Sequence, residues 1–539
     1  LALCGNTTGC LNTAVGVCSS CAMTTGQQNI SMGGSSLIAN TTGSRNSALG
    51  MSSLAANTTA DDNAAVGHGA LSTNTDGHSN TAVGRAALQA NTTADENVAV
   101  GFQALNSVTT QGAMTAVGTC ALKNTTGAQN TGFGYKALTT NSSGQCNTAL
   151  GLCALTANTS ANYNTAVGHS SMLKTTTGFA NTAMGLFSMA CNTTGDAHVA
   201  IGYESLLNNT TADNNIAIGC KAMRANTTGH SNTAIGILAL DANTTANSNT
   251  AVGFCALSSN TTGASNTAIG HNAMYEGTTT GDFNTMVGVS SGRKMTSGNQ
   301  NTSSGVNSME SNTTGASNVA FGMSALAANT TASNNTALGH SALTANTTAS
   351  NNTAVGFEAL KTNITGSGNT AVGRDALETN TANDNTAVGY EALKLNAAGT
   401  RNSAVGRNAL EANTSGDNNT AMGTNALLLN TTADNNTAFG ADALTANTTG
   451  AKNIGVGANA LAANTTADNN IAVGCGAMLN NTTGAENNAI GNSSLCANTE
   501  GTNNTALGHL ALRANTTADN NTAVGMSALT ANTTGAQNV

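Results

Sequence analysis

The chain repeats one short phrase along its whole length. Between Asn352 and Gly440 the phrase reads Asn-Thr-Ala-Val-Gly, continues for about a dozen variable residues and then begins again. The closing glycines run from Gly16 to Gly525; there are 31 of them, separated by 27 intervals of 17 residues, two of 16 and one of 18. A period this short predicts a solenoid in which each repeat is one coil stacked on the next. We therefore expect a single repetitive rod over residues 1–539, with about 31 coils.

Composition argues against several classes of protein. Only 8% of the residues are charged and 3% aromatic, and the net charge is −9. Disorder requires low hydrophobicity and high net charge, whereas 39% of this chain is hydrophobic and recurs at fixed positions. The 16 Lys and Arg residues are scattered singly, which disfavours nucleic-acid binding. No apolar run approaches the ~20 residues of a membrane span. We expect no nucleic-acid partner, no membrane span and no cofactor.

When each closing glycine is numbered as position 0, the residue types at the other positions distinguish the interior of the coil from its exterior. Position 4 is Leu or Met in 29 of 31 coils, and the exceptions are Ser20 and Gly292. The residue before the glycine is apolar except at Ser304, and position 3 is always Ala or Ser. Charged residues avoid all three positions. These columns predict a structural core that includes Val355, Leu360, Val372, Leu377, Val388, Leu393, Val405 and Leu410.

The phrase also predicts the local structure of a coil. Thr-Ala-Val-Gly is typical of a strand of about four residues. The Ala-Leu segment is compatible with a second strand or a helical turn, and we favour a strand because 17 residues leave no room for a helix. Asn-Thr-Thr is typical of an outer turn. Stacked coils would align the Asn that opens each phrase into an amide ladder. The predicted fold class is all-β, a parallel β-solenoid or β-roll.

Both faces of the predicted strand lack charge. Neighbouring residues point to opposite faces, so Thr and Val share one face, and Ala and Gly share the other. A strand that is apolar on both faces is normally buried on both. One face can line the coil, and a parallel homotrimer would cover the other. The chain begins and ends inside a repeat, so we expect either a stretch of a longer protein or coils that stack end to end in a filament.

The phrase from Asn521 to Ala531, Asn-Thr-Ala-Val-Gly-x-x-Ala-Leu-x-Ala, resembles the head repeats of trimeric autotransporter adhesins. It is also similar to repeat regions of phage tail-fibre and related cell-surface proteins. The resemblance extends over essentially all 539 residues. It implies a left-handed parallel β-roll in a homotrimer, at a cell or virion surface. The coil here is longer than the family's by about three residues, because Asn-Thr-Thr is inserted.

Histidine and cysteine give few candidates for chemistry. Five of the eight histidines occupy position 1 in coils far apart, so we interpret them as surface residues without a catalytic or metal cluster. Cys4 and Cys21 are one coil apart, which brings them within range of a disulfide, and free thiols are the alternative. The segment from Tyr275 to Gly305 is the most irregular, and we interpret it as a defect or hinge.

The Asn-Thr-Thr turns carry the clearest functional signal. Each is an Asn-x-Ser/Thr acceptor for N-glycosylation, and the alternative is that Asn and Thr only form turns and ladders. A third possibility is small O-linked sugars on the Thr residues. The candidate acceptors are Asn6, Asn40, Asn57, Asn91, Asn329, Asn346, Asn413, Asn430, Asn447, Asn464, Asn481, Asn515 and Asn532.

The sequence favours a structural function. Catalysis would require one coil to differ from the others in several clustered polar residues, and none does. We therefore predict a non-enzymatic subunit of an extracellular fibre, filament or adhesin shaft, located outside the cell, on its surface or on a virion. Its expected partners are further copies of itself, with glycans or a host-surface ligand as additional candidates. The alternative is a solenoid whose surface binds a ligand or ice.

Overall fold

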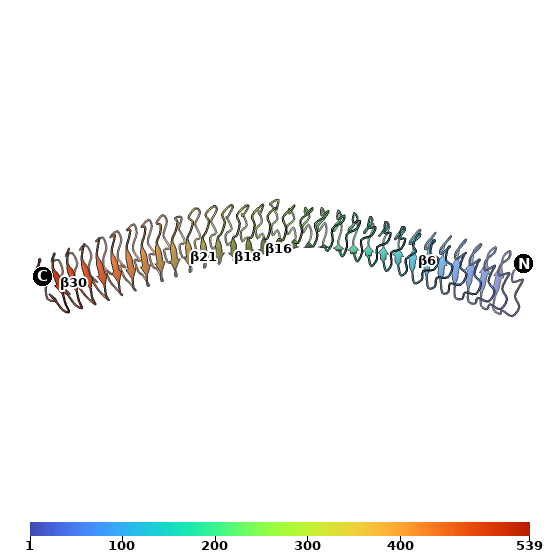
Figure 1. Ribbon diagram of the computed structural model, residues 1–539, viewed down its shortest axis with the longest axis horizontal. Coiled ribbons are helices and arrows are strands. Elements are labelled where there is room, and N and C mark those ends of the chain that lie inside the picture. Colours follow the sequence, from blue (N-terminus) through green and yellow to red (C-terminus); the bar gives the residue numbers. More distant parts are fainter. The chain divides into compact units, whose positions relative to one another are not determined.

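The computed structural model describes residues 1–539 and contains strands and turns but no helix. The chain divides into two compact units, Leu1–Asn266 and Thr267–Val539. Each unit is a parallel β-solenoid with one three-residue strand in every coil of about 17 residues, which confirms the predicted fold class. Within each unit, the strands follow one another in sequence order along one side of the coils, and the turns form the other side (Figure 1).

The first unit contains fifteen strands, β1 (Thr13–Val15), β2 (Ile30–Met32), β3 (Ser47–Leu49), β4 (Ala64–Val66), β5 (Thr81–Val83), β6 (Val98–Val100), β7 (Thr115–Val117), β8 (Thr131–Phe133), β9 (Thr148–Leu150), β10 (Thr165–Val167), β11 (Thr182–Met184), β12 (Val199–Ile201), β13 (Ile216–Ile218), β14 (Thr233–Ile235) and β15 (Thr250–Val252).

The second unit contains sixteen strands, β16 (Thr267–Ile269), β17 (Thr285–Val287), β18 (Thr302–Ser304), β19 (Val319–Phe321), β20 (Thr336–Leu338), β21 (Thr353–Val355), β22 (Thr370–Val372), β23 (Thr386–Val388), β24 (Ser403–Val405), β25 (Thr420–Met422), β26 (Thr437–Phe439), β27 (Ile454–Val456), β28 (Ile471–Val473), β29 (Asn488–Ile490), β30 (Thr505–Leu507) and β31 (Thr522–Val524).

The strands pair in parallel and in register with the next coil. Between β21 and β22, for example, Thr353 pairs with Thr370 and Val355 with Val372. The 16-residue coil that follows keeps this register, because β22 and β23 again align Thr with Thr and Val with Val. Equivalent residues therefore form columns in each unit, with a spacing of about 4.8 Å.

The interior of a coil is made of Leu and Ala. Leu360, Leu377, Leu393 and Leu410, the leucines of the predicted core, are all fully buried. They pack against the middle residue of the strand, which is Ala in most coils and is also fully buried. At Gly455, which takes this middle place, an added Cβ would lie 3.4 Å from the Leu444 side chain. The interior therefore has room for about one methyl group opposite each leucine.

The valines of the predicted core lie on the outside, so that part of the prediction is wrong. Val372 and Val388 are 36% and 37% exposed, and Val355 and Val405 are half-buried. Successive strand residues alternate between faces. Because the narrow interior accepts Ala at the middle position, the Thr before it and the Val after it must both point outward.

The predicted second strand is also absent. The Ala-Leu segment forms turns in which the leucine adopts a left-handed backbone, with φ of 51° at Leu360. Such a backbone costs an L-residue roughly 1–2 kcal/mol. Two gains offset this cost: the Leu360 side chain is buried, and its N–H donates to Ala376 O of the next coil at 3.0 Å. The chain thus turns sharply while its backbone stays hydrogen-bonded between coils.

The irregular segment near residues 275–305 has a compensated core. Gly292 stands where most coils have Leu or Met, and Met286 stands where the neighbouring strands have Ala or Ser. A Cβ added to Gly292 would lie 2.8 Å from Met286 Sδ, so the methionine occupies the space of the missing leucine. β17 and β18 pair in register. The interpretation of a packing defect is therefore wrong at this coil.

Candidate functional site

The most distinctive surface of the molecule is the outward side of the strands. We define the strand face of each unit as the first and third residues of every strand, such as Thr353 and Val355 in β21. The first residue is Thr in most strands, and the third is apolar in all of them except at Ser304. The 16 Lys and Arg and the 25 Asp and Glu residues all lie outside the strands. The strand face is therefore an uncharged strip that is uncovered within the chain.

Two columns of buried asparagine lie beside the strand. In the first, the Asn that opens each phrase accepts the N–H of its equivalent in the next coil, as Asn436 Oδ1 does from Asn453 at 2.9 Å. Its Nδ2 donates to a turn carbonyl, Gly450 O for Asn436, at 2.9 Å. The second column is the Asn of Asn-Thr-Thr, where Asn447 Nδ2 donates to Asn430 Oδ1 at 2.9 Å. Both columns use carbonyl oxygens of the same turn, because Asn447 Nδ2 also donates to Gly450 O.

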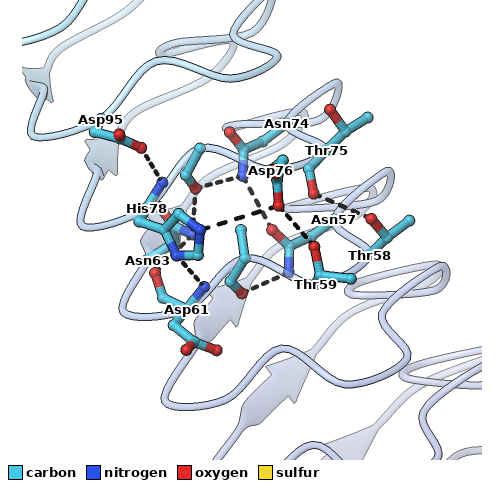
Figure 2. Close-up of polar contacts among 12 residues, drawn as sticks. Asn57, Thr58, Thr59, Asp61, Asn63, Asn74, Thr75, Asp76, His78 and Asp95 are labelled. Atoms are coloured by element: carbon cyan, nitrogen blue, oxygen red, sulfur yellow. Dashed lines mark hydrogen bonds and ion pairs between the residues drawn. The ribbon is translucent and has the colours of Figure 1, made fainter.

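The polar side chains of the turn are ordered in the same way, from the buried asparagines to the exposed outer side. Figure 2 shows Asn57 below Asn74 and Thr58 below Thr75 on successive coils. The backbone N–H of Asp61 donates to His78 Nδ1 at 2.9 Å, and the backbone N–H of His78 donates to Asp95 Oδ1 at 2.6 Å. The contacts join one coil to the next, and the polar side chains stabilise the stacking of coils.

This arrangement contradicts the display of most candidate glycosylation sites. Eleven of the thirteen acceptors are fully buried, namely Asn40, Asn57, Asn91, Asn329, Asn346, Asn413, Asn430, Asn447, Asn464, Asn481 and Asn515. Their Nδ2 atoms, which would carry the sugar, donate hydrogen bonds inside the coil, as in Asn464 to Ala467 O at 3.1 Å. Only Asn6 is exposed, and Asn532 is half-buried. In these turns, Asn forms the ladder and the following Thr residues face outward.

The sequence-based prediction did not include a second set of N-glycosylation acceptors. Six Asn-Asn-Thr motifs place an exposed Asn just before the Asn that opens a phrase, at Asn334, Asn351, Asn418, Asn435, Asn503 and Asn520. Their backbones are left-handed, with φ of 57° at Asn418 and 61° at Asn435. The motif was visible in the sequence, but the neighbouring Asn-Thr-Thr motifs share its pattern and are far more frequent. Exposure in the fold separates the two sets.

We predict that an oligosaccharyltransferase acting on the folded chain attaches sugars at Asn418 and Asn435 and leaves Asn447 and Asn464 unmodified. The physical reason is that only the first pair is exposed. Peptide mass spectrometry after glycosylation in vitro checks this outcome, and a chain unfolded before the reaction is the control, in which all four sites should react. Sugars on Asn447 of a chain that remains folded would contradict the burial of this column.

One coil replaces the ladder asparagine with His198, which is buried. Its ring reproduces both contacts of the amide. Nδ1 accepts the N–H of Asn215 at 3.1 Å, as the Asn oxygen does in other coils, and Nε2 lies 2.5 Å from Ala212 O. This pairing requires a neutral ring with its proton on Nε2. Burial lowers the pKa of His198 below its ordinary value of 6.5, although the nearby Asp196 and Asp213 oppose this shift.

His198 should therefore make stability depend on pH. Because its pKa is lower in the folded chain, the unfolded chain binds more protons as the pH falls below about 6.5, and the folded state loses stability there. We expect the denaturation midpoint of the wild type to fall between pH 7.5 and pH 5, and His198→Asn to reduce that fall. His509→Asn, at an exposed histidine, is the matched control and should leave the fall unchanged. Equal behaviour of both variants would contradict the role of His198.

The cysteines at the beginning of the chain lie together. Cys4 Sγ and Cys21 Sγ are 3.7 Å apart on successive coils, and both are free thiols. Partial burial, together with the Cys4 and Cys18 thiols, raises the pKa of the Cys21 thiol. The distance places the pair next to one another, as expected from their spacing of one coil.

Exposed rings and cations also form a column in the second unit. Arg374 lies over the rings of Phe357 and Tyr390, at 5.5 and 5.9 Å from their centroids, and Arg407 lies 5.8 Å from Tyr390. His340 stacks on Phe357 with centroids 5.3 Å apart. The faces of these aromatic rings are covered by the neighbouring Arg and His side chains. The column therefore adds stacking energy between coils and offers mainly ring edges to solvent.

The surface has no pocket, and no group of three or more His, Cys, Asp or Glu side chains is placed to hold a metal ion. No helix long and apolar enough to cross a membrane is present. Compared with models of known protein families and with curated proteins, the chain matches none. The resemblance to adhesin and tail-fibre repeats therefore stays a prediction.

Proposed function

We propose that the chain is a structural shaft, a subunit of an extracellular fibre, filament or adhesin at the surface of a cell or virion. The observation that carries this proposal is that the same contacts recur coil after coil within each unit. At about 4.8 Å per coil, the fifteen strands of the first unit extend over roughly 70 Å. A repeat of this kind sets a distance and presents one surface many times.

The internal bonding supports a mechanical role. In regular coils each ladder Asn bonds to the coils before and after it, and the Thr columns add bonds such as Thr448 Oγ1 to Thr465 O at 3.0 Å. Buried hydrogen bonds of this kind are costly to break without a replacement. Pulling coils apart would break many of them together, which favours a stiff shaft. Exposed Thr residues such as Thr449 would be available for small O-linked sugars.

A binding surface is the second candidate, because the strand face carries a row of Thr with a regular spacing. A flat Thr row could order water or meet a ligand lattice. The adjoining row of third residues, however, varies in size from Ser304 to Phe321. Recognition of ice requires a uniform surface, so this variation favours the structural role. A measurement of thermal hysteresis tests the alternative, which predicts depression of freezing below the melting point.

Immunogold electron microscopy of the native source tests the proposed function. Antibodies against the chain should label elongated fibres or surface projections along their length. Label confined to dispersed particles or to the cell interior would contradict a fibre shaft.

A further inference from the structure

We propose that the strand face of this chain is an interface that a second copy covers with its own strand face. This inference rests on the proposed structural function and names the partner of the same surface. Its starting point is that every strand except β18 leaves a large apolar side chain partly uncovered where charge is absent. Met422 is 39% exposed and Phe439 is 42% exposed in neighbouring strands, and the pattern holds along both units.

The absence of charge is a property of these positions and not of exposed positions in general. Other outward positions of the coil carry the charges, for example Lys361 and Arg407. Strand positions that face solvent are normally polar or charged, and they alternate with buried apolar positions. Among the third residues of the sixteen strands in the second unit, Ser304 is the one polar exception. Such a surface is typical of one that meets another protein surface.

The area of the face is large enough for a stable interface. An aliphatic side chain that is about a third exposed leaves on the order of 50 Å² uncovered, so fifteen strands present ~750 Å², compared with ~800 Å² per partner in a standard interface. The Thr methyl groups of the first row add to this area. The apolar strip and the Thr methyl groups together thus reach the usual size without any contribution from the turns.

The partner that fits best is the same chain. A rigid partner that keeps contact over many coils must repeat at the same spacing of about 4.8 Å, and a second copy does so. Two uncharged faces can also meet without burying an unpaired charge. Sheets packed face to face lie ~10 Å apart, which leaves space for the Thr and aliphatic rows to interdigitate. The variation in size of the third residue is compatible with such interdigitating side chains.

Charge substitution on and off the face tests the proposal with the full chain. The face variant is Val372→Lys, Val405→Lys and Phe439→Lys, which changes every second coil. The matched variant is Ile364→Lys, Leu395→Lys and Leu429→Lys, at turn positions that are 44–47% exposed and also on alternate coils. We expect mass photometry to show association of the wild type and of the matched variant, and at least a hundredfold weaker association of the face variant, because it buries unpaired ammonium groups. Circular dichroism verifies that all three are folded.

Peroxide oxidation of the wild type gives a second measurement that requires no substitution. Met184 and Met422, which are 41% and 39% exposed, lie on the strand face, and Met51 and Met323, which are 54% and 50% exposed, lie off it. In assembled chains we expect the face methionines to oxidise several-fold more slowly than the other two, and dilution into the dissociated state should reduce this ratio to the small one that their exposures imply.

Three results would overturn the inference: a wild type that stays monomeric at micromolar concentration, equal weakening by the two triple variants, or a ratio of oxidation rates between the two pairs of methionines that does not change with concentration. If the purified chain is monomeric but the native source contains labelled fibres, other surfaces hold the fibres together. That result would reject this interface and leave the proposed function intact. If the purified chain associates through its strand face but antibodies label no fibre in the native source, the interface would stand and the proposed function would be rejected.

Discussion

Leu377→Asp is expected to destabilise the second unit by at least about 4 kcal/mol, because it removes a buried aliphatic side chain and places a carboxylate without a partner in the coil interior. Leu377 is fully buried. Chemical denaturation of the full chain, followed by circular dichroism, measures the effect. The loss should appear as an early unfolding step, since coils in a solenoid depend on their neighbours.

The matched control is the next residue along the chain. Glu378 Oε2 lies 3.9 Å from Lys394 Nζ at the surface, and such a pair contributes less than about 1 kcal/mol. Glu378→Gln should therefore leave the denaturation curve almost unchanged. Equal destabilisation by the two substitutions would show that the interior and exterior have been assigned wrongly.

Gly440→Ala is expected to cost about 3 kcal/mol or more, through both backbone strain and a clash. Gly440 has φ of +140°, which L-residues rarely adopt, and an added Cβ would lie 2.5 Å from Gly457 O in the next coil. The glycine column thus allows coils to approach closely where the strand ends. The change in denaturation midpoint of the second unit is the measurement.

Gly525→Ala separates the two causes. Gly525 has a similar φ of +127°, but an added Cβ would meet only Ala528 Cβ, at 4.0 Å. This substitution should cost only the strain, about 1–2 kcal/mol. If Gly440→Ala were no worse than Gly525→Ala, close approach between coils would not be the reason for glycine at this position.

The sequence was sufficient to predict the coil and its period, but not which side of the strand faces inward. Leu377 could be placed inside because Leu and Met fill its column and charge is excluded. Val372 met the same criteria, since its column is also apolar and uncharged. What decides its place is volume: the interior opposite Leu has room for the methyl group of Ala371, and Val372 must point outward. Hydropathy carries no information on that volume.

The asparagine column of the Asn-Thr-Thr turns was misjudged for a related reason, whereas the predicted ladder of the Asn that opens each phrase is confirmed. Asn447 belongs to a glycosylation motif, to a turn and to a ladder, and the motif alone does not distinguish them. Its regular recurrence at position 7, like that of Asn436 at the start of the phrase, was the available signal for a buried ladder. The break at Val108 illustrates the rule, because Asn91 Oδ1 in the preceding coil is then left without a hydrogen-bond partner.

Departures from the repeat are compensated by contacts that the sequence did not reveal. Ser20 replaces a core leucine, and its hydroxyl lies 2.8 Å from Ser31 Oγ, where most strands have Ala. Ser19 Oγ lies 2.6 Å from the same hydroxyl. The three serine hydroxyls thus form hydrogen bonds with one another in the coil interior. In another coil, Met286 fills the volume that Gly292 leaves. Pairs of this kind are recognised only when the coil geometry is known.

Cryo-electron microscopy of the assembled chain tests the central claim most directly, namely that stacked coils build a shaft through an outward Thr and aliphatic face. The account predicts coils repeating at about 4.8 Å, with Leu and Ala inside and the strand faces of two copies opposed at ~10 Å. Isolated single solenoids with the strand face open to solvent, or coils with valine inside and alanine outside, would contradict it.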